Sequence, residues 1–184
     1  MRIMSGKFRG RRLKGPRSMD LRPTGDRLKE TLFNIVAPEI AGSRVLDVFA
    51  GTGAIGLEAL SRGAQQVVFI ESGQEALRLI RQNLALCGIT EGFRILQGDV
   101  FAALRTLARE AFAADLTFLD PPYQWRPYGD LLEILFGTGI ARPGSKVVIE
   151  HHRKSVMPES EKGFQRVRTV RQGDKCLSFY EPIE

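Results

Sequence analysis

The sequence has little cysteine and no long apolar run, and these two features limit the classes of protein to which it can belong. Its 184 residues include two cysteines, Cys87 and Cys176, which follow no metal-binding or redox spacing. We therefore expect buried free thiols, no metal site and a reducing compartment. No segment approaches the length of a membrane span, and the first residues lack the apolar core of a signal peptide. A soluble, cytoplasmic protein without a membrane partner is predicted.

Internal repeats, low-complexity tracts and linkers are also absent. With 43% hydrophobic residues, 184 residues make one domain of ordinary size, enough for a sheet covered by helices on both faces. A second catalytic domain does not fit. We predict a single domain over residues 1–184.

Acidic residues are scarce at the start of the chain. Residues 1–22 hold eight Lys or Arg and one acid, Asp20, a net charge of +7, so residues 23–184 sum to −1 when the whole chain is +6. This basic arm (1–22) on a near-neutral body (23–184) indicates a phosphate-backbone partner, and a solvated tail is the alternative. Apolar residues alternate with the cations, and Gly6 and Gly10 favour a hairpin that presents the arginines.

One stretch organises the rest of the chain. The apolar run Val45–Phe49 ends in Gly51-Thr-Gly53-x-x-Gly56 and passes directly into a helical pattern, which is typical of a nucleotide-type cofactor loop. Gly51 and Gly53 permit positive φ, and Gly56 lets the helix pack near its strand. A tight strand-to-helix turn without a ligand is the alternative. Asp47, inside the apolar run, needs a hydrogen-bonding partner such as loop amides or a cationic ligand group.

The body alternates strand and helix, which predicts parallel strands joined by right-handed crossovers. A first helix spans 22–36, capped by Thr24 or Asp26 and closed by Pro38. Strands are predicted at 44–49, 67–71, 93–97, 115–119 and 146–150. Helices are predicted at 54–62, 73–87, 99–111 and 127–136. A terminal antiparallel hairpin joins 166–172 to 175–181 through Gly173-Asp174.

Acidic residues recur where successive strands end, and ligands of such sheets bind at that edge. Glu71 lies twenty positions after Gly51, where a carboxylate can accept hydrogen bonds from both hydroxyls of a ribose. Asp99 either caps the next helix or contacts an adenine amine. These acids suit NAD and S-adenosylmethionine about equally.

Asp120-Pro121-Pro122-Tyr123, after the fourth strand, decides between the two cofactors. Asp120 and the Pro121 carbonyl can accept both protons of an exocyclic amine, and Tyr123 can stack on a base. The two prolines fix φ and remove two amide donors. A simple Pro-Pro turn is the alternative.

With these residues the sequence resembles the amino-methyltransferases that use S-adenosylmethionine, and more closely the RsmD family, which methylates the guanine N2 amine at one position of bacterial 16S ribosomal RNA. The more specific likeness lies in Arg22-Pro-Thr24 with Leu32-Phe-Asn34, and in the helix Leu57-Glu-Ala-Leu-Ser-Arg-Gly63. Gly25 departs from the family pattern. The resemblance covers essentially the whole chain. It implies the α/β class I (Rossmann-like) methyltransferase fold, with a mostly parallel sheet completed by the hairpin.

The resemblance also implies roles for individual residues. The cofactor-binding candidates are Asp47, Phe49, Ala50, Gly51, Thr52, Gly53, Ala54, Gly56, Glu71, Asp99 and Val100. The candidates beside the target amine are Asp120, Pro121, Pro122 and Tyr123. The RNA-binding candidates are Lys7, Arg9, Arg11, Arg12, Lys14, Arg22 and Arg27. The expected substrate is ribosomal RNA or the small ribosomal subunit, and a monomer is expected.

Two other functions remain open. A DNA adenine-N6 or cytosine-N4 methyltransferase shares Asp-Pro-Pro-Tyr but usually needs added sequence for target recognition. A noncatalytic RNA-binding or ribosome-assembly protein would not need all four acids at the strand ends.

Overall fold

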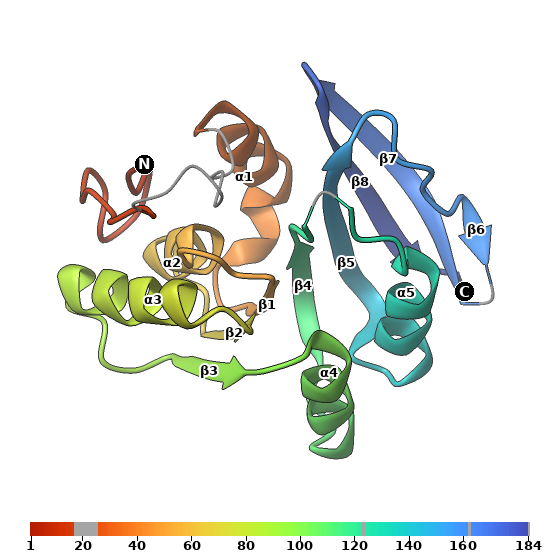
Figure 1. Cartoon of the computed structure of the whole chain (residues 1–184), viewed down its shortest axis with the longest axis horizontal. Coiled ribbons are helices and arrows are strands. Elements are labelled where there is room, and N and C mark those ends of the chain that lie inside the picture. Colours follow the sequence, from red (N-terminus) through yellow and green to blue (C-terminus); the bar gives the residue numbers. More distant parts are fainter. Residues whose placement is uncertain (17–25, 123, 162, 184) are drawn as a thin grey trace.

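The fold is built on one eight-stranded sheet, seen in a computed structural model that describes residues 1–16, 26–122, 124–161 and 163–183. The strand order is β3-β2-β1-β4-β5-β8-β7-β6 (Figure 1). The strands are β1 (Arg44–Val48), β2 (Gln66–Glu71), β3 (Phe93–Gln97), β4 (Ala114–Leu119), β5 (Ala141–His152), β6 (Ser160–Glu161), β7 (Phe164–Gln172) and β8 (Lys175–Pro182). Strands β1 to β5 pair in parallel, and β8 and β7 continue the sheet antiparallel to β5. The predicted mostly parallel sheet with a terminal hairpin is confirmed.

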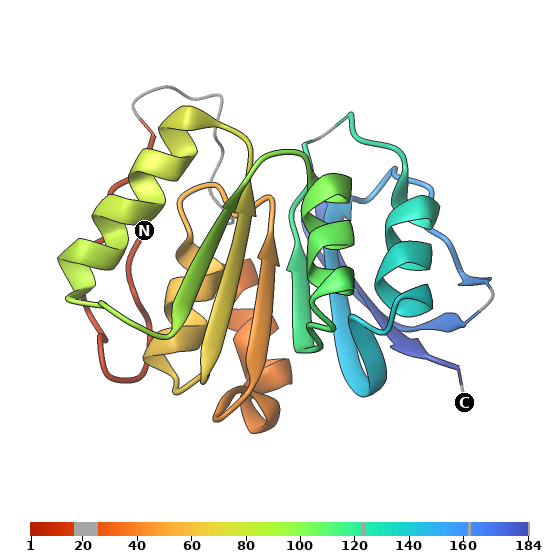
Figure 2. The ribbon, with the colours of Figure 1, turned by 90° about the horizontal axis from the view of Figure 1, so that it is seen from below.

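Helices cover both faces of the sheet (Figure 2). They are α1 (Asp26–Ile40), α2 (Ala54–Ser61), α3 (Gln74–Cys87), α4 (Val100–Arg109) and α5 (Tyr128–Gly137). One core cluster joins α1, α2 and α3 to one face, and a second joins α4 and α5 to the other. The central strands β1, β2 and β4 are buried between two helical layers, so they read as nearly continuous apolar runs.

The sheet reverses its strand order between β1 and β4. The crossover from β1 leads outward to β2 and β3, and the chain then returns to place β4 on the other side of β1. Loops leaving the carboxyl ends of β1 and β4 therefore diverge, and ligands of open α/β sheets bind in the crevice formed there. The glycine loop follows β1, and Asp120 follows β4.

The predicted end of the first helix was wrong. α1 does not stop before Pro38 but continues to Ile40, with Pro38 inside its last turn. Proline removes one amide donor, and this loss is offset because Ile40 is only 1% exposed in the core. Ser43 closes the helix, since its amide and hydroxyl both donate to the Ile40 carbonyl, at 3.0 and 2.7 Å. The predicted beginning at residues 22–25 and its cap, at Thr24 or through the Asp26 side chain, lie outside the described part.

Other boundaries shift by a few residues, and one short strand was missed. β5 begins at Ala141, five residues before the predicted start, and the short β6 pairs with β7. Cys87 and Cys176 are buried free thiols, as predicted. Among the described residues no helix is long and apolar enough to cross a membrane.

Candidate active site

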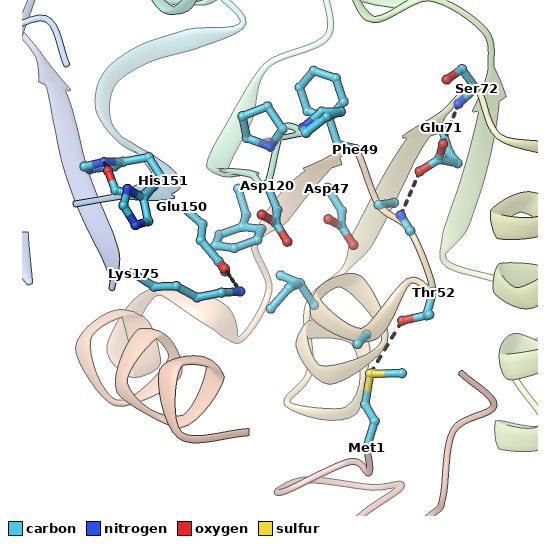
Figure 3. Close-up of a pocket in the computed structure, with 18 of the residues that line it drawn as sticks. Met1, Asp47, Phe49, Thr52, Glu71, Ser72, Asp120, Glu150, His151 and Lys175 are labelled. Carbon is cyan, nitrogen blue, oxygen red and sulfur yellow. Dashed lines mark hydrogen bonds and ion pairs between the residues drawn. The ribbon is translucent and has the colours of Figure 1, made fainter. Parts of the chain in front are cut away.

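A cavity of about 420 Å³ lies along the carboxyl edge of the sheet, where β1 and β4 diverge (Figure 3). Ten predicted residues line it: Asp47, Phe49, Ala50, Gly51, Thr52, Ala54, Glu71, Asp120, Pro121 and Pro122. Residues far apart in the chain thus meet in one cavity, because ligands of open α/β sheets bind at the carboxyl ends of the strands. Gly53, Gly56, Asp99 and Val100 are not among the lining residues, and Tyr123 lies outside the described part.

Each of the three glycines Gly51, Gly53 and Gly56 is explained by its own backbone conformation or packing. Gly51 and Gly53 have φ of 55° and 76°, and Gly53 is the N-cap residue of α2. A Cβ on Gly56 would stand 2.3 Å from Cε1 of Phe69 in β2, so only glycine lets the helix approach its strand this closely. Phe49 also has positive φ, 58°, which is rare for a bulky residue and concentrates strain where the loop lines the cavity.

Glu71 holds the glycine loop as well as facing the cavity. Its Oε2 accepts the Gly51 amide at 2.8 Å, and its Oε1 accepts the amides of Ser72 and Gly73 at 2.8 and 2.7 Å. A carboxylate has about four acceptor positions, so three backbone amides leave capacity for a ligand hydroxyl. The carboxylate is thus oriented before any ligand arrives.

Asp47 finds its partner in the first turn of α2. Its Oδ2 accepts the Gly56 amide at 2.9 Å, and the residue is 2% exposed. Burial raises the pKa of Asp47 well above its ordinary value, the Gly56 hydrogen bond opposes the rise, and the nearby Asp120 and Glu71 charges add to it. Asp47 therefore has the hydrogen-bonding partner that its burial requires, but this amide belongs to α2 and not to the loop before it.

Aromatic packing supports the Asp120-Pro-Pro turn. The Asp120 amide donates to the Val48 carbonyl at 3.3 Å, and the Trp125 amide donates to the Pro122 carbonyl at 2.8 Å. The Trp125 ring packs edge-on against Phe49 and Tyr128, at 5.4 and 5.2 Å between centroids. These contacts join described residues of the loop after β4 to the loop after β1, so the two walls of the cavity support each other.

Asp99 caps a helix in this structure. Its Oδ1 accepts the Ala102 amide at 3.0 Å, at the start of α4. The capping alternative is therefore correct, and contact of Asp99 or Val100 with adenine stays a prediction.

Sequence reasoning missed much of the opposite wall. The lining residues not predicted are Met1, Ile55, Ser72, Phe118, Tyr128, Glu150, His151, His152 and Lys175. Glu150 could have been found, because it follows Ile149 near the carboxyl end of β5, as Asp120 follows β4. Lys175 gave no signal, since it reaches the cavity from an antiparallel strand. His151 is held by Ser178 Oγ at 2.8 Å, and burial lowers the pKa of His151, which favours the neutral ring.

The basic arm is docked on the body rather than solvated along its described length. Within the arm, Arg2 and Arg12 form an antiparallel bridge, and the neighbouring Ile3 and Leu13 are buried at 1% and 8% exposure. Gly6 and Gly10 have φ of 82° and 84°, so the predicted hairpin-like turn is confirmed. A Cβ on Gly6 would stand 1.8 Å from the Ser61 carbonyl oxygen.

Helix α2 provides the docking groups. Glu58, fully buried, accepts the Met4 and Ser5 amides at 2.8 and 3.0 Å. Ser61 donates to the Ser5 carbonyl at 2.6 Å and accepts the Phe8 amide at 2.9 Å. Two cations, Lys29 of α1 and Arg62, neutralise Glu58 at 3.5 and 2.8 Å. The Leu-Glu-Ala-Leu-Ser-Arg segment thus carries the arm, and Lys29 is buried together with Leu28, while Arg27 and Glu30 are exposed.

Asn83 of α3 connects the arm to the glycine loop. Its Oδ1 accepts the Lys14 amide at 2.8 Å, and its Nδ2 donates to the carbonyls of Lys14 and Thr52 at 3.1 and 3.0 Å. Thr52 also donates to Met1 Sδ at 3.5 Å. The arm therefore begins at the rim of the cavity.

Most of the predicted cations of the arm point outward. Lys7, Arg9, Arg11, Arg12 and Lys14 are exposed, as is Arg27 on α1, and Arg22 lies outside the described residues. Arg11 also donates to the Leu86 carbonyl at 2.6 Å, so it fastens the arm to the end of α3.

The sheet order, the glycine loop and the Asp-Pro-Pro turn together define the class I methyltransferase fold. The family model described as Conserved hypothetical protein 95 matches residues 1–181. The chain belongs to this family, the RsmD family of 16S ribosomal RNA methyltransferases.

Individual relatives agree with this assignment. The chain is 35% identical to Ribosomal RNA small subunit methyltransferase D of Escherichia coli over 181 residues, 98% of this chain and 89% of that protein. It is 35% identical to the Haemophilus influenzae protein of the same name, over 87% of this chain and 84% of that one. A solved hypothetical protein of Thermus thermophilus superposes with a TM-score of 0.83 at 31% identity, covering 98% and 99% of the two chains.

Proposed function

We propose that the protein transfers a methyl group from S-adenosylmethionine to the exocyclic N2 amine of a guanine in 16S ribosomal RNA. The observation that carries the proposal is the single cavity that joins Glu71 and the glycine loop to the Asp120-Pro-Pro turn. Relatives named ribosomal RNA small subunit methyltransferase D support RNA as the substrate.

The residues at the glycine-loop end fit the cofactor. Glu71 keeps one acceptor position for a ribose hydroxyl, and a Cβ on Gly51 would meet nothing nearer than the Phe49 carbonyl oxygen, at 4.0 Å. Asp47 is held by the Gly56 amide beneath the loop, and a bound cationic amino group of the methionine part would favour its ionised form, because an opposite charge lowers the pKa of a carboxylate. Bound S-adenosylmethionine supplies an electrophilic methyl group on a sulfonium.

The Asp-Pro-Pro turn acts on the amine. A guanine amine is a poor nucleophile because its lone pair is delocalised into the ring. Acceptors at Asp120 and the Pro121 carbonyl favour a pyramidal nitrogen with a localised lone pair, and they are fixed before reaction by the packing of Trp125. The proton released on methylation leaves through Asp120 or water. Flipping the base into the cavity costs a few kcal/mol, and less in a loop.

The docked arm supplies the contact to the RNA backbone. The exposed cations of the arm are Lys7, Arg9, Arg12 and Lys14, and the first residue of the arm lines the cavity. Phosphates that these cations bind therefore lie near the reacting base. The protein acts as a monomer, in the cytoplasm where its substrate is made.

Methyl transfer from labelled S-adenosylmethionine tests the proposal. Naked 16S RNA, assembled small subunits and DNA are offered in parallel, and the labelled nucleotide is mapped. Label on guanine N2 of the RNA or subunit is the expected result. Label only on DNA would support the adenine or cytosine enzyme, and binding of RNA without transfer would support a noncatalytic role.

A further inference from the structure

Beyond Asp120, the cavity ends in an ion pair that the reaction described above does not use. Glu150 of β5 is 3% exposed, and its Oε1 accepts a hydrogen bond from Lys175 Nζ of β8. Its other oxygen, Oε2, is buried and accepts no hydrogen bond from any described residue. Both side chains line the cavity.

The register of the sheet places this pair next to Asp120. β4 and β5 are parallel, with Leu119 opposite Ile149, so Asp120 and Glu150 follow at the same height on neighbouring strands. Neighbouring strands lie about 5 Å apart. In Figure 3, Asp120 lies in the middle of the cavity, and Glu150 and Lys175 lie on the side of it away from Glu71 and Ser72. The strands follow one another across the sheet in the order β4, β5, β8. The groups that they carry are therefore two acceptors, Asp120 and Glu150, followed by a cation, Lys175.

A structural role alone does not account for the pair. An ion pair that only joined β5 to β8 would gain nothing from burying a carboxylate oxygen without a partner, because buried acceptors are nearly always satisfied. The cation is the more exposed partner, at 27%, while the carboxylate is at 3%. The open acceptor instead suits a donor that enters with the substrate.

We propose that Glu150 and Lys175 select guanine by reading its Watson–Crick edge, with Glu150 Oε2 accepting N1–H and Lys175 Nζ donating to O6. The inference rests on the proposed function, since it assumes that the N2 amine lies at Asp120. Along that edge guanine presents the N2 amine, N1–H and O6, which are donor, donor and acceptor. Asp120, Glu150 and Lys175 present the complementary series in the same order.

The same contacts would reject other bases. A purine with an unprotonated N1 and an amine at C6 turns its lone pair toward the Glu150 carboxylate and its donor toward the Lys175 ammonium. Sites built to hydrogen-bond a polar edge discriminate strongly because a mismatched ligand leaves buried groups unpaired.

The test uses a substrate that keeps the reacting amine and reverses the rest of the edge. RNA is prepared with guanine or with 2,6-diaminopurine at the mapped position, and kcat/KM for methylation of the 2-amine is measured for each. The wild type should prefer guanine by about 10²-fold or more, in line with discrimination by hydrogen-bonding pockets. Glu150→Gln, whose amide can donate to an unprotonated N1, should lower the guanine rate, raise the diaminopurine rate and reduce the preference at least about tenfold.

Matched variants separate base reading from fold. Glu181→Gln alters the Lys146–Glu181 pair, 3.9 Å apart, which also joins β5 to β8 but lies outside the cavity, and should leave the preference unchanged. Lys175→Gln should reduce the guanine rate and raise the diaminopurine rate, because its amide oxygen can accept a hydrogen bond from the C6 amine. Calorimetry with S-adenosylmethionine should give wild-type affinity for every variant, which shows that each is folded.

The outcomes distinguish this inference from the proposed function. If the wild type methylates guanine N2 but Glu150→Gln and Lys175→Gln keep the full preference for guanine, the pair does not read the base and only this inference fails. If the wild type methylates another atom or another base, the proposed function fails and the inference fails with it.

Discussion

The two ends of the cavity differ in how their carboxylates are satisfied. At the glycine-loop end, Glu71 accepts three backbone amides and Asp47 accepts one. At the β5 end, one oxygen of Glu150 accepts none from the described residues. The first end is shaped by the chain itself before a ligand binds. The second end keeps an acceptor for a group that the described residues do not supply, so the two ends should respond differently to substitution.

The largest expected effect lies between the two ends, at Asp120. Asp120→Ala removes one oriented acceptor from the amine and should slow single-turnover methylation about 10²–10³-fold, while Asp120→Asn keeps an acceptor oxygen and should lose less. Both variants should bind S-adenosylmethionine normally. The control is Asp130→Ala, an exposed residue of α5 outside the cavity.

Equal inactivity of Asp120→Asn and Asp120→Ala would show that the negative charge matters more than the acceptor position. Proton removal by Asp120 would then be the better account. A wild-type rate for Asp120→Ala would remove the turn from the amine site.

Glu71 tests the preorganised end directly. Glu71→Ala should weaken S-adenosylmethionine binding by about 1–3 kcal/mol in calorimetry, because it removes the ribose acceptor and releases three amides that shape the loop. RNA binding without cofactor should persist. Glu75→Ala, in the first turn of α3 and exposed, is the matched control. Unchanged affinity in folded Glu71→Ala would exclude it from the cofactor site.

The ionised form of Asp47 is expected to lower the stability of the folded protein and to strengthen the binding of S-adenosylmethionine. Burial raises the pKa of Asp47, so the folded state binds its proton more tightly than the unfolded state does. The wild type should therefore lose stability from this group as pH rises from its unfolded value, near 3.8, through the raised folded value. Asp47→Asn keeps an acceptor for the Gly56 amide but does not titrate, so its stability should not fall with pH in this way.

Urea unfolding of both proteins over a pH series measures the effect. The free energy of unfolding of Asp47→Asn minus that of the wild type should increase with pH, while S-adenosylmethionine affinity falls. A difference that is constant with pH would mean that Asp47 does not titrate in this range.

The smallest effect concerns the docked arm. Arg9→Gln with Arg12→Gln should weaken RNA binding and lower the log-log salt slope by up to about one for each lost phosphate contact. Arg11 is left intact because it holds the arm to Leu86. Arg105→Gln with Arg109→Gln makes the same charge change on α4. Cofactor affinity should be unchanged in both, and an RNA salt slope equal in the two double variants would remove the arm from the RNA interface.

The fold was predictable because its signals are local. Apolar runs, the Gly51-x-Gly53-x-x-Gly56 turn and acids at strand ends each lie within a few consecutive residues, and the parallel topology then brings them to one edge. The error at Pro38 has the opposite cause, since burial of Ile40 in the core outweighs the local preference of proline to end a helix.

The sequence by itself determined the class of fold, the loop that faces the cofactor and the turn that faces the amine, because each depends on residues adjacent in the chain. Only the tertiary structure decided where the arm lies and what completes the cavity. Glu58 and Asn83 bind backbone groups of the arm more than fifty positions away, and Lys175 reaches Glu150 from an antiparallel strand. Long-range hydrogen bonds of this kind leave no periodic pattern in the sequence, because the two partners lie far apart in the chain and meet only in the folded protein.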